Sequence, residues 1–154
     1  MLPDAPPDRA EIAPTLNRVL GEIAARLDPD VLGCGSLAML RRLDLGPNGT
    51  LAEPTLQRLL AQHVPDAWAD RDGDRLWALL VHAMALAGTR GIRFGVGLGG
   101  PLFAADYKEG RLTRLLEARG EALAVAVPRA VRFLVALDKS LDPIALARFV
   151  LGVA

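Results

Sequence analysis

Apolar residues recur at the spacing of an α-helix along nearly the whole chain. In the first such run, from Ile12 to Leu27, leucine, isoleucine and valine recur at helical spacing. Pro14 is acceptable in the first turn of this predicted helix, and Asp28-Pro29 is expected to end it. No segment alternates apolar and polar residues over the length of a useful strand. The pattern therefore predicts an all-α chain.

Three further helices follow in the first part of the chain. Their predicted starting residues are Ser36, Pro54 and Asp74. The first of them carries Leu37, Leu40 and Leu43, and the second turns Leu56, Leu59 and Leu60 inward. The helix that Asp74 begins is apolar nearly all round and stops at Gly88, so we expect it at the buried centre of the bundle.

A glycine-rich segment, 88–101, separates this part from a second helical part. There the pattern predicts helices over 102–105, 108–118, 121–137 and 144–151, with Pro128 expected to kink or split the third and Asp142-Pro143 to start the last. The predicted architecture is two small packed helical bundles, residues 1–90 and residues 91–154, joined by the glycine-rich connection.

Charge is balanced in total but divided along the chain. The 154 residues carry 18 Lys+Arg and 18 Asp+Glu. Residues 1–77 hold 8 Arg against 12 acidic residues, whereas residues 78–154 hold 10 basic against 6 acidic residues. Such asymmetry points to a polyanionic partner for one face, or to acids and bases that neutralise each other in the folded chain.

The sequence offers little for catalysis, metal binding or membrane insertion. Cys34 is the single cysteine, and with only His63 and His82 it does not readily build a zinc site. His82 lies among apolar residues and is expected in the core, and His63 has no evident carboxylate partner. No apolar run reaches the ~18–20 residues of a membrane span, and the N-terminus lacks the features of a signal peptide. We expect a cytoplasmic protein that is not an enzyme and needs no cofactor or metal.

Residues 95–100 satisfy the pattern G-x-G-x-x-G. A dinucleotide site would also need a preceding strand and a βαβ unit, which the surrounding sequence does not predict. We expect these glycines to let the backbone bend, although free backbone amides there could hold a phosphate.

Basic residues carry the strongest functional signal. Lys108, Arg111 and Arg114 form a stripe on one predicted helix, and Arg129 and Arg132 lie one turn apart on the next. A groove that follows nucleic-acid phosphates needs several such charges on adjacent helices. The alternative is a solvated surface with pairs such as Arg114 with Glu117. The candidate nucleic-acid-binding residues are Arg41, Arg42, Arg90, Arg93, Lys108, Arg111, Arg114, Arg119, Arg129 and Arg132. With only 5% aromatic residues, base stacking is expected to contribute little.

Several of these segments resemble one known family. Gly35-Ser-Leu-Ala-Met-Leu-Arg-Arg42 resembles the G-x-x-A-x-x-R-R segment of the CasB family, the small subunit of type I-E CRISPR-associated Cascade complexes. The segments 98–104, 107–119, 128–134 and 141–147 are similar to that family's small-residue helix start, E-x-R-x-x-x-L-L core, R-x-x-R-x-L helix and closing segment, in that order. The resemblance covers most of residues 33–150.

The resemblance implies two small helical bundles without catalytic activity. Members lie as paired copies against the Cascade backbone and large subunits, beside the guide RNA, and help to hold the displaced single strand of target DNA. The residues that match the family's arginines are Arg41, Arg42, Arg111, Arg119, Arg129 and Arg132. Two other hypotheses stay open: a helical adaptor with no nucleic-acid role, and a small enzyme that binds a nucleotide at residues 95–100.

Overall fold

The computed structural model describes residues 9–46, 49–68 and 71–152, and their backbone is helical almost throughout. The helices are α1 (Arg9–Arg26), α2 (Pro29–Leu32), α3 (Cys34–Arg41), α4 (Pro54–His63), α5 (Arg71–Gly91), α6 (Gly99–Ala104), α7 (Glu109–Glu117), α8 (Glu121–Ala136) and α9 (Pro143–Leu151), with a 3-10 turn, η1, at Asp66–Trp68. The only β-type pairing among the described residues is an isolated bridge between Ile92 and Leu141. The prediction of an all-α fold is confirmed.

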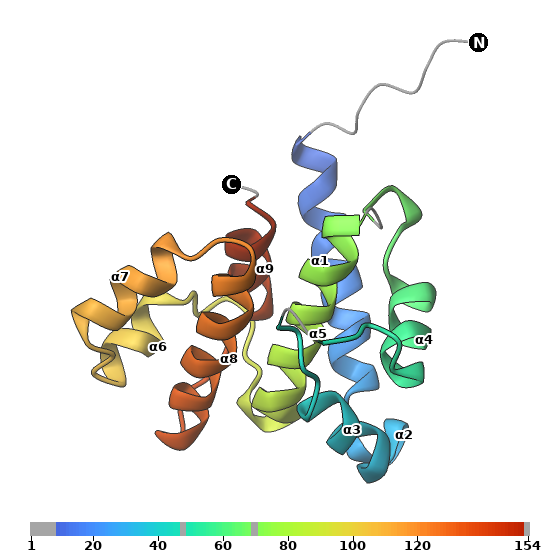
Figure 1. Cartoon of the computed structure of the whole chain (residues 1–154), viewed down its shortest axis with the longest axis horizontal. Helices are drawn as coiled ribbons and strands as arrows, with labels where there is room; N and C mark the ends of the chain where they lie inside the picture. Colours follow the sequence, from blue (N-terminus) through green and yellow to red (C-terminus); the bar gives the residue numbers. More distant parts are fainter. Residues whose placement is uncertain (1–8, 47–48, 69–70, 153–154) are drawn as a thin grey trace.

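Helix α5 lies at the centre of the molecule (Figure 1). Helices α1, α3 and α4 pack on one side of it, and α8 and α9 pack on the other. Its apolar circumference explains this position: residues 77–85 are all buried, including His82, which was expected in the core. Buried residues from both halves of the chain form one hydrophobic cluster around it. The boundary near residue 90 between two bundles stays a prediction.

The predicted inward faces are confirmed where the structure describes them. Leu16, Val19, Leu20, Ile23 and Leu27 of the first periodic run are buried. The same holds for Leu37 and Leu40 on α3 and for Leu56, Leu59 and Leu60 on α4, whereas Leu43 is half-buried just beyond α3. Gly88 adopts φ 70° and ψ 168°, which breaks the regular part of α5 as predicted.

Two predicted helix starts are wrong. Helix α3 begins at Cys34 after Gly33, so Ser36 lies inside its first turn instead of capping it. Helix α5 begins at Arg71, so Asp74 also lies inside a first turn. Polar residues are favourable both at a cap and in the first turn, and the sequence pattern does not separate these positions.

Three further predictions concern prolines within a helix or at its start. Helix α1 begins at Arg9, so Pro14 stands in its second turn instead of its first. Helix α8 continues from Glu121 to Ala136 through Pro128 and is not split by it. Asp142-Pro143 starts α9 as predicted, since the Asp142 carboxylate accepts hydrogen bonds from the amides of Ile144 and Ala145 at 3.0 and 3.3 Å.

No helix in the described ranges is long and apolar enough to cross a membrane.

Candidate nucleic-acid interface

A groove between α7 and α8 gathers four of the predicted arginines. Its lining residues are Tyr107, Arg111, Arg114, Ala126, Arg129, Arg132 and Phe133, and it encloses about 550 Å³. We call this feature the arginine groove. Arg111 and Arg114 come from one helix and Arg129 and Arg132 from the other, so the two stripes expected from the sequence meet along one surface.

Packing between α7 and α8 sets this geometry. Leu115 of α7 is buried, as are Val127, Ala130 and Val131 of α8, and all four line one small apolar pocket where the two helices pack. Because Arg111 and Arg114 are three residues apart, they occupy neighbouring positions on α7. Arg129 and Arg132 have the same spacing on α8. The apolar contacts therefore leave both arginine pairs exposed at the groove.

The guanidinium groups of the arginine groove are not neutralised by carboxylates. Among the described residues, Glu22 forms an ion pair with Arg18 at 3.1 Å and lies 3.3 Å from Nδ1 of His63, and both contacts are outside the groove. The alternative pairing of Arg114 with Glu117 is not among them. Four cations with no facing carboxylate in the described lining make a site for an anion with several negative charges.

Two aromatic residues lie in the same groove, where the sequence did not lead us to expect them. The rings of Tyr107 and Phe133 meet edge to face, with centroids 5.1 Å apart and planes at 63°. The guanidinium carbon of Arg111 lies over the Phe133 ring, 5.9 Å from its centroid. The sequence signal that could have identified them is that Tyr107 directly precedes Lys108 and Phe133 directly follows Arg132.

Two of the predicted arginines are engaged elsewhere. Arg41 donates a hydrogen bond from Nε to the Ala85 carbonyl at 2.9 Å, which ties α3 to the end of the regular part of α5. Arg119 donates from Nη1 to the carbonyls of Leu116 and Ala118 at 3.0 and 2.7 Å, at the end of α7. Carbonyl groups at helix ends attract such cations. These two residues have a structural use that the sequence did not indicate.

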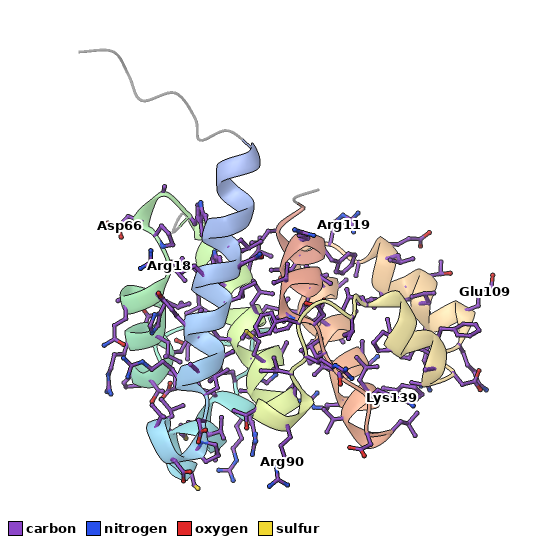
Figure 2. The ribbon with its side chains drawn as sticks, turned by 180° about the vertical axis from the view of Figure 1, so that it is seen from behind. Arg18, Asp66, Arg90, Glu109, Arg119 and Lys139 are labelled. Atoms are coloured by element: carbon purple, nitrogen blue, oxygen red, sulfur yellow. The ribbon has the colours of Figure 1, made fainter. Side chains whose placement is uncertain are left out.

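The remaining candidates lie outside the groove. Arg42, Arg90, Arg93 and Lys108 are exposed but do not line it. Figure 2 shows Arg90 at the lower edge of the molecule and Arg119 at its upper edge, so the ten predicted residues do not form one compact site.

A larger cavity, of about 720 Å³, lies between residues 44–46 and 49–51, α5 and the start of α8. Its described lining includes several leucines, the cations Arg75 and Arg119, and the acids Asp44 and Glu121. Because its charges balance, this cavity is less suited to a polyanion than the arginine groove is.

The glycine segment is held by an internal carboxylate. Asp142 is buried, and its Oδ2 accepts hydrogen bonds from the amides of Gly95 and Gly97 at 3.0 and 2.9 Å. The expectation that free amides remain there for a phosphate is therefore wrong for these two glycines.

The histidines have structural surroundings. Burial lowers the pKa of His82, whose Nδ1 lies 2.8 Å from the Leu40 carbonyl oxygen. His63 does have a carboxylate neighbour, since Glu22 of α1 approaches its Nδ1, which corrects the expectation that it had none. No group of three or more His, Cys, Asp or Glu side chains that could hold a metal occurs in the part of the chain that the structure describes.

Comparisons with protein families, curated proteins and solved structures find no match.

Proposed function

We propose that this protein is a non-catalytic small subunit of a CRISPR RNA-guided Cascade complex, and that it contacts nucleic-acid backbone in the arginine groove. In that role it stabilises the displaced strand of the R-loop during antiviral defence in the cytoplasm. The Cascade part of the proposal is supported by the sequence resemblance. The nucleic-acid part is supported by one structural observation: four arginines on two helices line one groove with no carboxylate in its described lining.

The physical basis is neutralisation of phosphates. A guanidinium group can donate two parallel hydrogen bonds to one phosphate, and each phosphate contact releases condensed counterions. The resulting affinity does not depend on base sequence, because phosphate contacts position the strand without identifying its bases. Base pairing between guide and target would supply the sequence specificity of the complex.

The test has two stages. Tagged protein is purified from its native host, or with the neighbouring genes co-expressed, and the bound nucleic acid is separated on a denaturing gel. We expect a short RNA of uniform length together with several larger proteins in fixed ratio. A multi-protein assembly without any nucleic acid would contradict the proposal.

The full chain alone is then titrated with a labelled single-stranded oligonucleotide at several salt concentrations. We expect the logarithm of the binding constant to fall linearly with the logarithm of the salt concentration, by about 0.7 for each phosphate contacted. Absence of salt-dependent binding would contradict the arginine groove as a nucleic-acid site, even if the protein belongs to a Cascade complex.

A second candidate, a helical adaptor that docks on another protein, is favoured by one observation. Phe103 on α6 is 89% exposed, and Leu116 on α7 is 53% exposed. A partner protein covers such side chains where they form a contiguous apolar patch. An assembly that survives replacement of all four groove arginines, but not Phe103→Ser, would favour the adaptor role.

A further inference from the structure

We infer that Tyr107 and Phe133 make the arginine groove a stacking subsite for an unpaired nucleobase, so that its ligand is single-stranded nucleic acid held by base and phosphate together. This inference rests on the proposed function, because it adds a contact with the bases of the strand whose phosphates the same groove binds. It differs from backbone binding alone, which needs no aromatic side chain.

The position of the aromatic pair carries the inference. Tyr107 and Phe133 are half-buried, and they line the groove together with the four arginines. The backbone of Tyr107 is fixed by a 3.0 Å hydrogen bond from its amide to the Leu102 carbonyl. The Tyr107 ring also packs against the Phe133 ring, and rings that are held in place lose little conformational freedom when a base stacks on them.

Arg111 links the two kinds of contact. Its guanidinium group lies over the Phe133 ring and also belongs to the cationic lining. A guanidinium group beside an aromatic ring can accept a base on its face and can donate hydrogen bonds to phosphate at its edge. The aromatic and cationic parts of the groove therefore act on the same nucleotide.

The chemistry of the ligand follows from these groups. In a duplex the faces of the bases are covered by neighbouring base pairs, and only the backbone and base edges are accessible. An unpaired strand can turn a base face toward Tyr107 while its phosphates meet the arginines. A volume of about 550 Å³ is within the range of pockets that hold small ligands, and it leaves room for a base with its phosphate.

The experiment compares two oligonucleotides with the same phosphates. One is a short oligothymidylate, and the other is an abasic strand of equal length, so that only the bases differ. Each is titrated against the full chain, against Tyr107→Leu and against Tyr107→Phe. Thermal unfolding of each variant shows that the fold is retained, and the leucine keeps apolar volume at the half-buried position.

We expect the full chain to bind oligothymidylate about tenfold more tightly than the abasic strand. Tyr107→Leu should remove most of this difference, and Tyr107→Phe should preserve it. The salt dependence should be unchanged in both variants, because neither removes a cation. Preference for the single strand over a duplex of the same sequence should fall in Tyr107→Leu alone.

The possible failures are distinguishable. Equal binding of the two oligonucleotides, with normal salt dependence, would overturn the stacking subsite and leave the phosphate contacts of the proposed function intact. A base-dependent difference that persists in Tyr107→Leu would overturn the subsite at this residue. No binding of either strand would overturn the nucleic-acid part of the proposed function, and the subsite with it.

Discussion

Two regions of this chain have the donors for a phosphate, and the structure uses them in opposite ways. In the glycine segment, the amides of Gly95 and Gly97 already donate to the buried carboxylate of Asp142. In the arginine groove, no carboxylate stands in the described lining. Donor groups alone therefore do not make a binding site. What matters is whether the folded chain has already supplied their acceptors.

The same contrast divides the arginines themselves. Arg41 and Arg119 donate to main-chain carbonyls, whereas Arg111 and Arg129 face the groove. From the sequence, all four were candidate nucleic-acid-binding residues that match the arginines of one family. Their hydrogen bonds separate residues that hold the fold together from residues that are available to a ligand.

The largest effect should come from removing the four groove cations together. At about 0.1 M salt, one counterion-releasing contact to a single strand contributes roughly fivefold in affinity. The variant Arg111→Gln/Arg114→Gln/Arg129→Gln/Arg132→Gln should therefore bind a single-stranded oligonucleotide roughly several hundredfold more weakly. The slope of log K against log salt should fall by about 3. Fluorescence anisotropy over a range of salt concentrations measures both.

A control removes two exposed cations that lie outside the groove, Arg58 of α4 and Arg148 of α9. We expect Arg58→Gln/Arg148→Gln to bind nearly as the unmodified chain does. Because all six positions are exposed, both variants should unfold at nearly the same denaturant concentration as the unmodified chain. A similar loss of affinity in the control would show that binding depends on overall charge and not on the groove.

The next effect concerns the region whose donors are already used. Asp142→Ala leaves the amides of Gly95, Gly97, Ile144 and Ala145 without their carboxylate acceptor. We expect it to lower the free energy of unfolding by about 3 kcal/mol, since it removes a helix cap and buried hydrogen bonds to a charge. Asp142→Asn should have an intermediate effect, because one of its two terminal atoms still accepts. Urea denaturation measures both.

Glu117→Ala is a suitable comparison for these variants, because Glu117 is exposed and takes part in no described ion pair. It should change the unfolding free energy by less than about 0.5 kcal/mol. Binding of oligonucleotide at the groove should persist in folded Asp142→Asn. If Asp142→Asn were as stable as the unmodified chain, the carboxylate would not be the element that holds the glycine segment.

Sequence periodicity predicted the buried faces of the helices well, because side-chain spacing along one helix directly determines which residues share a face. It could not predict that α7 and α8 would bring two arginine pairs into one groove, since that depends on long-range packing. The aromatic contact between Tyr107 and Phe133 joins residues 26 positions apart for the same reason. The hydrogen bond from Arg41 to the Ala85 carbonyl was equally inaccessible, because a main-chain acceptor leaves no signal in residue identity.

A smaller effect should separate the neighbouring arginines Arg41 and Arg42. Arg41→Ala loses the hydrogen bond to the Ala85 carbonyl, so we expect a loss of about 1 kcal/mol in the free energy of unfolding. Arg42→Ala should be nearly neutral in stability, since Arg42 is exposed and no described side-chain hydrogen bond involves it. If the family resemblance holds for this pair, Arg42→Ala should reduce the salt slope by about 0.7. An equal reduction in Arg41→Ala would mean that its guanidinium exchanges the carbonyl for phosphate.

The smallest effect should be a dependence of stability on pH at the contact between α3 and α5. Burial lowers the folded-state pKa of His82, and nearby Arg132 acts in the same direction, whereas the hydrogen bond with the Leu40 carbonyl opposes them. Because the folded pKa lies below the unfolded value, His82 contributes stability that is fully present above about pH 6.5 and is lost as the pH falls through the folded pKa.

Chemical denaturation between pH 7.5 and pH 5, carried out on the unmodified chain and on His82→Gln, should show a shallower decline of the unfolding free energy in the variant. Parallel declines would place the titration on another group, and Glu22 would not be that group above pH 5, because its pKa is lowered from 4.5 by Arg18 and His63.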